Sequence, residues 1–185
     1  MALPNIFTKE IVTQLTGRIN RLTTESTPLF GKMNVAQMLA HCNVTYEMVY
    51  EDKHKKPSGF AKFLLKAFVK KIVTNEVPYK PNGRTAPQFL IVDERNFDQE
   101  KARLIAYIEK TQQQGEAFFD QKESHSFGKL NTAEWNNMFY KHINHHLGQF
   151  AVWFTSHIKN SQTIKIKSRQ PEPVEGGTIK KKFGI

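Results

Sequence analysis

The sequence predicts an all-α fold in which long helices pack around one hydrophobic core. Apolar residues recur at spacings of three and four along four long segments, which is the periodicity of helices with one buried face. The chain contains 14 phenylalanines but few segments that alternate apolar and polar residues, so we expect aromatic side chains to fill a helical core. With 185 residues, of which 39% are hydrophobic and 24% charged, the composition is globular and the length suits one domain.

Capping and turn-forming residues indicate where the helices begin and end. Asn34 and Asn131 can each cap a helix, because Gln37 and Glu134 follow them three residues later. Gly115 can end a helix in the left-handed conformation. These signals and the apolar periodicity predict helices over residues 7–22, 34–50, 60–73, 97–114 and 132–157. The proline-containing stretch 74–95 should be a long ordered connection, and residues 116–130 a loop.

The helical domain is expected to span residues 1–158. Residues 159–185 lose the apolar periodicity and are basic, so we expect a flexible C-terminal tail. The net charge of the chain is +10, of which Lys165–Ile185 supplies +4. This charge permits contact with nucleic acid or acidic surfaces, but no recognition helix or RNA-binding signature accompanies it, so no specific nucleic-acid partner is expected.

Cysteine content and hydropathy bear on the cellular location. Cys42 is the only cysteine, which rules out an intramolecular disulfide and fits a reducing cytoplasm. No secretory signal opens the chain, and no segment reaches the roughly 18 apolar residues of a membrane span, so a cytoplasmic protein is expected. The basic segment Phe60–Val73 could lie on an anionic membrane as an amphipathic helix. Because its apolar face lacks tryptophan, we favour the alternative, in which it covers the core and points its lysines to water.

An unusual group of histidines lies in the last helix, where three of the seven in the chain fall within five residues. One buried seam of this helix would consist of Trp135, Phe139, His142, His146, Gln149 and Trp153. His142 and His146 are four residues apart, so their side chains are offset by only about 40° and point the same way. They could hold one metal ion, or they could form a hydrogen-bonded pair in the core.

A third imidazole could come from the helix that begins at Asn34. His41 lies beside the apolar stripe of that helix, and alone it would be an ordinary boundary histidine. Beside the other two it would complete a three-histidine site that leaves coordination positions open for water or substrate. His145 diverges from His146 by ~100° and cannot share its metal ion. Gln149 is placed to line the site or to brace a ligand.

Several segments resemble the DinB/YfiT-like superfamily of metalloenzymes. They are Asn34-Val35-Ala36-Gln37-Met38-Leu39-Ala40-His41, then His142, His145, His146, Gly148 and Gln149, with Phe127–Leu130, Glu134-Trp135 and Tyr140–His142 resembling an uncharacterised branch of unknown function. The resemblance covers residues 5–157. It implies a four-helix bundle with one long crossover connection, to which the 60–73 helix would be an extra short element. It also implies a divalent metal held by His41, His142 and His146.

The resemblance further implies an activity. Characterised members of the superfamily include thiol-dependent S-transferases, so a small-molecule substrate and a low-molecular-weight thiol cosubstrate are implied. Zinc or nickel is the expected ion, because imidazole nitrogen suits both. No general base stands at a recognisable spacing, and Glu47, Asp93 and Glu134 are candidates only because they are carboxylates. This favours chemistry in which the metal activates the nucleophile.

Three functions stay open on the sequence alone. The first is a metal-dependent transferase or hydrolase acting on a small molecule. The second is a metal-binding protein without catalysis, either a sensor or a structural bundle, because a fold analogy does not fix a function. The third is a basic protein that binds nucleic acid or acidic surfaces. The oligomeric state is open, and a homodimer is one option.

Overall fold

The part of the chain that the computed structural model describes, residues 2–153, contains four long helices. They are α1 (Lys9–Asn20), α2 (Val35–Tyr50), α5 (Phe97–Phe119) and α6 (Thr132–Gln149). The mostly helical fold agrees with the sequence prediction. Within the described part, no helix combines the length and apolar character needed to cross a membrane. The predicted tail, residues 159–185, lies outside the described residues.

Side-chain caps begin α2 and α6 where the sequence predicts. The Asn34 side chain accepts a hydrogen bond from the Gln37 backbone N–H at 2.9 Å, and the Gln37 side chain accepts one from the Asn34 N–H at 3.1 Å. Asn131 and Glu134 form the same reciprocal pair, at 2.9 and 3.0 Å. Each pair satisfies two backbone N–H groups that the start of a helix would leave without partners. The two helices that carry the candidate site residues therefore begin at defined positions.

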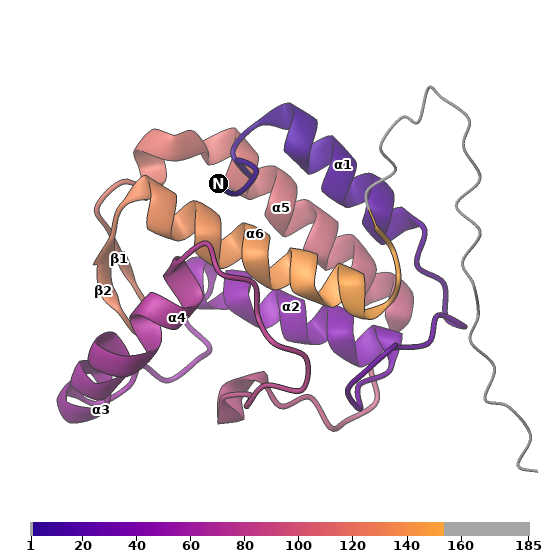
Figure 1. The fold of residues 1–185 in the computed structure, drawn as a ribbon, viewed down its shortest axis with the longest axis horizontal. Coiled ribbons are helices and arrows are strands. Elements are labelled where there is room, and N and C mark those ends of the chain that lie inside the picture. Colours follow the sequence, from indigo (N-terminus) through magenta and orange to yellow (C-terminus); the bar gives the residue numbers. More distant parts are fainter. Residues whose placement is uncertain (1, 154–185) are drawn as a thin grey trace, which may run out of the picture. The chain divides into compact units, whose positions relative to one another are not determined.

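The four long helices enclose one hydrophobic core (Figure 1). Aromatic rings from three of them meet inside it. Phe139 stacks on Tyr46, with ring centroids 5.0 Å apart, and on Trp135, at 5.4 Å. Phe119 packs edge-on against Trp135 at 5.4 Å. The predicted filling of the core by aromatic side chains is confirmed.

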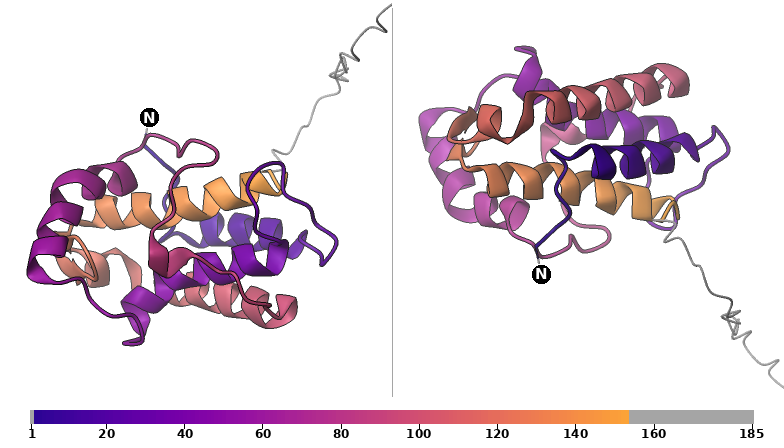
Figure 2. Two further views of the ribbon diagram at one scale, coloured as in Figure 1. Left: turned by 90° about the horizontal axis from the view of Figure 1, so that it is seen from below. Right: turned by 90° about the horizontal axis from the view of Figure 1, so that it is seen from above.

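A long crossover connection runs from α2 to α5. Its helical segments are α3 (Gly59–Leu64), the π-helical turn η1 (Leu65–Val69), α4 (Lys70–Thr74) and the 3-10 turn η2 (Pro87–Phe89). The chain after α4 passes across α2 and α6 (Figure 2). The buried Lys141 of α6 anchors it, because its Nζ donates to the carbonyls of Ile72 and Asn75, both at 2.7 Å. Burial lowers the pKa of Lys141 to about 8.

The segment 60–73 was expected to cover the core with its apolar face, but several of its phenylalanines face solvent. Phe60, Phe63 and Phe68 are 75%, 63% and 69% exposed, so these side chains do not cover the core. Only the opposite side of the segment faces the protein, where α4 packs against α6. The helical prediction is confirmed, but the prediction that the apolar face is buried is wrong for these phenylalanines.

A short β-hairpin follows α5, and the all-α prediction did not include it. Gly115 has the left-handed φ of 71° expected at a helix end, but the helix resumes after it and reaches Phe119. Strand β1 (Lys122–Ser124) then pairs antiparallel with β2 (Gly128–Leu130). Strands of three residues are too short to show a clear alternation of apolar and polar residues, so the sequence carries no strand signal there.

The end of α6 also differs from the prediction, because the helix stops at Gln149 instead of residue 157. Ala151 takes a left-handed φ of 57°, its N–H donates to the Gly148 carbonyl, and the Val152 N–H donates to the Leu147 carbonyl. These two bonds are those of a Schellman motif, which terminates a helix. Trp153 therefore leaves the seam and is 61% exposed, so its predicted burial is wrong.

We expect Ala151→Gly to stabilise the protein. A non-glycine residue in the left-handed region costs about 1 kcal/mol, which glycine avoids, so the free energy of unfolding should rise by about 0.5–1 kcal/mol. The matched control is Ala106→Gly in the exposed interior of α5, where glycine should lower it by about 1 kcal/mol. Urea unfolding followed by circular dichroism measures both, and a destabilised Ala151→Gly protein would contradict the assigned helix end.

Candidate metal centre

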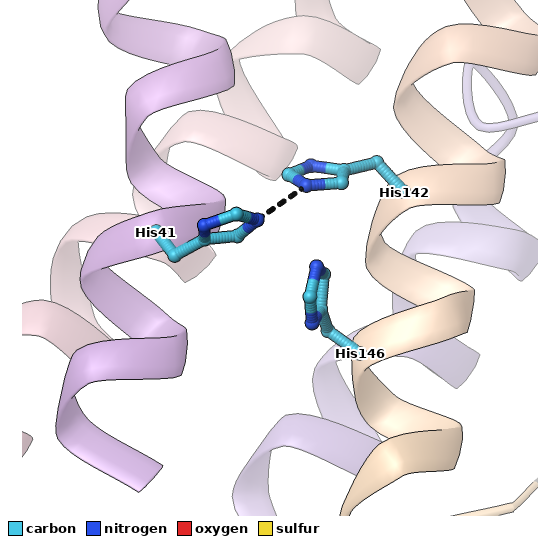
Figure 3. A group of neighbouring side chains, drawn as sticks. All are labelled: His41, His142 and His146. Atoms are coloured by element: carbon cyan, nitrogen blue, oxygen red, sulfur yellow. Dashed lines mark hydrogen bonds between the residues drawn. The ribbon is translucent and has the colours of Figure 1, made fainter. Parts of the chain in front are cut away.

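Three imidazole rings from α2 and α6 point toward one another in the space between the two helices (Figure 3). His41 comes from α2, while His142 and His146 come from α6. One ring nitrogen of each lies within 4.8 Å of the other two. The spacing of four residues puts His142 and His146 on the same face of α6, as the sequence predicts. The structure thus brings together the three histidines that the sequence proposes as metal ligands.

In two of these rings, the nitrogen that points away from the cluster, Nδ1, donates a hydrogen bond that fixes the orientation of the ring. His41 Nδ1 donates to the backbone carbonyl of Phe89 at 2.8 Å. His146 Nδ1 donates to Gln149 Oε1 at 2.9 Å. The amide group of Gln149 is itself fixed, because its Nε2 donates to the Phe30 carbonyl at 2.6 Å. With hydrogen on both Nδ1 atoms, the neutral rings present their Nε2 lone pairs to the space between the helices.

The third ring can adopt either tautomer, because its partner is a hydroxyl group. His142 Nδ1 lies 2.9 Å from Thr45 Oγ1, and its Nε2 lies 2.9 Å from His41 Nε2. When the hydroxyl donates, His142 Nε2 carries the hydrogen and donates to His41. When the hydroxyl accepts, the lone pair of His142 Nε2 joins the other two. The same three rings therefore serve either as a hydrogen-bonded pair with a neighbour or as a set of three nitrogen ligands.

Burial keeps all three imidazoles in the neutral form. His41 and His146 are buried, and His142 is partly buried. Desolvation is the main cause that lowers the pKa of each ring, well below the usual value for His142 and to about 3 for His146. Metal binding requires unprotonated nitrogens, so these rings are ready to bind a cation at neutral pH.

The lowered pKa values predict that the metal-free protein loses stability on acidification. Above about pH 6.5 the rings are neutral in both the folded and the unfolded chain, so they add no pH dependence. Below it the unfolded chain takes up protons that the folded protein refuses, and the free energy of unfolding falls by up to about 1.4 kcal/mol per pH unit for each ring. Urea unfolding in chelator at pH 7, 6 and 5 measures the loss. His146→Gln should give a shallower dependence, and an unchanged slope would contradict the assignment.

The histidines lie beside a cavity of about 850 Å³. Its walls come from α2, from η1 and α4, from the crossover, from the hairpin and from α6, and they are largely apolar. Lys80 and Arg84 of the crossover also line it, whereas no aspartate or glutamate does among the described residues. A large, mostly apolar cavity with a few polar groups is the usual form of a small-molecule site.

The carboxylates that the sequence offers as bases lie elsewhere. Glu47 is buried in ion pairs with Lys53 and with Arg103. Asp93 is bonded to Arg95 on the crossover. Glu134 belongs to the cap of α6. The chain therefore places no carboxylate base in the described wall of the cavity.

His145 lies outside the group of three, although it also borders the cavity. Its ring packs between those of Phe30 and Tyr79, with centroid distances of 5.4 and 5.7 Å. The divergence of about 100° between adjacent helical residues explains this separate position.

The sequence analysis did not identify two hydrogen-bonding groups that orient histidine rings of the site, or the glycine that makes room for Gln149. Thr45 stands four residues after His41 on the same side of α2, which was the available signal. The Phe89 carbonyl comes from the crossover and has no sequence signal. Gly31 has φ of 83°, and a Cβ atom there would lie 2.5 Å from Gln149 Nε2. Glycine is therefore needed for Gln149 to reach its position.

We expect Thr45→Val to weaken zinc binding by about 10–100-fold, because the buried His142 Nδ1–H would lose its acceptor. Thr111→Val is the matched control, since Thr111 is also buried but hydrogen-bonds Tyr50 and does not line the cavity. It should lower stability and leave zinc affinity unchanged. Titration against a chromophoric zinc chelator measures both, and equal affinities in the two variants would show that Thr45 does not orient a ligand.

Comparisons with known proteins place the chain in a family but give no activity. No curated protein matches it, and no solved structure does. A family model described as "Protein of unknown function (DUF1569)" matches residues 9–152, which include α1, α2, α5, α6 and all three clustered histidines. The chain therefore belongs to this DUF1569 family of proteins of unknown function.

Proposed function

We propose that this protein is a divalent-metal-dependent enzyme that acts on a small molecule in the cavity beside the three histidines. The observation that carries the proposal is the convergence of three rings, each bonded through Nδ1 to a separate partner. Metal-binding histidines are oriented in this way, by a partner on the second ring nitrogen. Three imidazole ligands also leave a position for water or substrate, as catalytic zinc sites do.

The three nitrogens suit zinc or nickel. Zinc–nitrogen distances of 2.0–2.1 Å in a tetrahedral site separate ligand nitrogens by about 3.3 Å. The nitrogens here lie within 4.8 Å of one another and the nearest pair is 2.9 Å apart, so small ring rotations reach that geometry. A bound divalent ion would lower the pKa of a coordinated thiol or water and so supply the nucleophile without a protein base. The apolar walls would bind and orient the second substrate and exclude bulk water.

Thiol S-transfer is the reaction that we favour. The resemblance to the DinB/YfiT-like superfamily supports this reaction, because characterised members include thiol-dependent S-transferases. On the same resemblance, we propose that the fold is that superfamily's four-helix bundle with one long crossover. In such a transfer the thiol sulfur bonds to an electrophilic carbon, the bond from that carbon to its leaving group breaks, and the thiol proton passes to solvent. The absence of a carboxylate from the described cavity wall is compatible with this route, because the ion replaces the base.

Metal binding without catalysis is the second candidate, since the same lack of a carboxylate also suits a sensor or a structural site. One experiment separates the two. The full chain is stripped with chelator, reloaded with zinc or nickel and supplied with low-molecular-weight thiols and 1-chloro-2,4-dinitrobenzene. We expect one ion per chain and a turnover that chelator abolishes. One ion without turnover of any thiol would favour the non-catalytic protein, and failure to bind either ion would refute both.

A further inference from the structure

The segment α3–η1–α4 carries a row of exposed apolar side chains. Phe60, Phe63, Leu64, Phe68 and Ile72 are 75%, 63%, 38%, 69% and 57% exposed. From about 150–250 Å² for each aromatic side chain, the three phenylalanines alone leave about 300–500 Å² in contact with solvent. That area is in the range of the largest apolar patch on a typical monomer, about 300–600 Å², and such a patch is often functional. We call these five side chains the apolar row.

The π-helical turn η1 helps to keep the apolar row on one side. On a regular α-helix each step of four residues drifts by about 40°, so Phe60 and Ile72 would lie about 120° apart. The wider turn of η1 lies between them and reduces this drift. Leu65, Val69 and Val73, on the inner side of the same segment, line the cavity, and Ile72 at the end of the apolar row also borders it. The segment is therefore both a wall of the candidate site and an exposed apolar surface.

Positive charge accompanies the apolar row. Residues 53–75 contain seven lysines and no aspartate or glutamate. Lys62 and Lys70 form ion pairs with glutamates of β1 and α6, at 2.7 and 2.8 Å. Lys66 and Lys71 are exposed. Residues 53–75 carry +7 and Lys165–Ile185 carries +4, which together slightly exceed the net charge of +10 of the whole chain.

We propose that α3, η1 and α4 form a docking surface for an anionic lipid bilayer. A helix of this kind lies in the plane of the interface, with its aromatic side chains at the acyl boundary and its lysines among anionic headgroups. Nucleic acid would neutralise the lysines but leave three phenylalanines in water. A second copy of this chain would cover the phenylalanines but bring two lysine-rich surfaces together, which is unfavourable. An anionic bilayer would both cover the apolar row and neutralise the lysines.

Co-sedimentation of the full chain with lipid vesicles tests the docking surface. The protein should bind vesicles that contain phosphatidylglycerol, bind vesicles of phosphatidylcholine alone much less, and dissociate as salt is added. The triple variant Phe60→Ser, Phe63→Ser, Phe68→Ser should bind the anionic vesicles at least about tenfold more weakly. Its control is Leu29→Ser, Leu90→Ser, Val92→Ser, which removes side chains that are 65%, 58% and 87% exposed elsewhere and should bind like the unaltered protein.

A second pair of variants separates the surface from general positive charge. Lys66→Glu with Lys71→Glu should weaken vesicle binding at least about tenfold. Lys9→Glu with Lys32→Glu makes the same change in net charge at exposed positions outside the segment and should have a much smaller effect. Both double variants keep the C-terminal basic stretch, so a difference between them is due to location.

Tryptophan fluorescence tests independently whether the docking surface itself contacts the lipid. Tryptophan introduced as Phe63→Trp should shift its emission to shorter wavelength on anionic vesicles, whereas Val92→Trp should not. The proposal is overturned if the full chain fails to bind vesicles containing phosphatidylglycerol, or if the triple phenylalanine variant binds them as well as the unaltered protein. It is also overturned if light scattering finds a dimer that this triple variant converts to monomers, since a second copy would then cover the apolar row.

Discussion

His142→Ala should remove most of the metal from a protein loaded with one zinc ion. The His142 ring centroid lies 4.9 Å from that of His41 and 4.8 Å from that of His146, so it contacts both of the other rings in the cluster. Loss of an outer partner of a ligand costs about 10–100-fold in affinity, so loss of the ligand itself should cost more than about 100-fold. Competition with a chromophoric chelator at neutral pH gives the affinity, and mass spectrometry of the desalted protein gives the ion content.

His145→Ala is the matched control for this experiment. His145 lies on the same helix and borders the same cavity, but its ring packs between Phe30 and Tyr79. The variant should keep an affinity within a few-fold of the unaltered protein. If His145→Ala lost the ion while His146→Ala kept it, the three-histidine centre would be assigned to the wrong residues.

Trp135→Ala should be among the most destabilising single substitutions in the chain. Trp135 is 1% exposed and packs against the rings of Phe119 and Phe139. Truncation of a core tryptophan costs about 3–5 kcal/mol, because apolar contact is lost and a cavity remains. Urea unfolding at neutral pH, monitored by circular dichroism, measures the change in the free energy of unfolding.

The other tryptophan provides the comparison. Trp153 is 61% exposed and lies beyond the end of α6, so Trp153→Ala should change the free energy of unfolding by less than about 1 kcal/mol. Equal losses for the two variants would show that Trp153 packs in the core and that the end of α6 is misassigned.

The parts of the fold that were predictable depend on interactions within one or two helical turns. The reciprocal caps at Asn34 and Asn131 involve residues three apart, so the sequence shows both partners at once. The common direction of His142 and His146 follows from a spacing of four on any helix. Their approach to His41 could be anticipated because His142 and His146 lie on the buried seam of their helix and His41 lies beside the apolar stripe of its own, and such stripes face one core.

The errors arose where the decisive contact was not visible in a local pattern. α6 was expected to continue to residue 157, because apolar residues continue at helical spacing. It ends at Gln149, where Ala151 adopts a left-handed conformation without the glycine that usually indicates such an end. The buried Arg18 of α1 donates to the Val152 carbonyl at 2.7 Å, a contact across 134 residues that holds the chain in this path.

The amino-acid sequence by itself determined the helical class, the starts of α2 and α6 and the three histidines, since periodicity and capping act between near neighbours. Only the tertiary structure decided which ring nitrogens face inward. That choice depends on the Phe89 carbonyl, on Thr45 across from His142 and on Gln149 held by Phe30, partners that are 48, 97 and 119 residues apart. Hydrogen bonds over such separations exist only after the helices and the crossover have packed, so no local pattern specifies them.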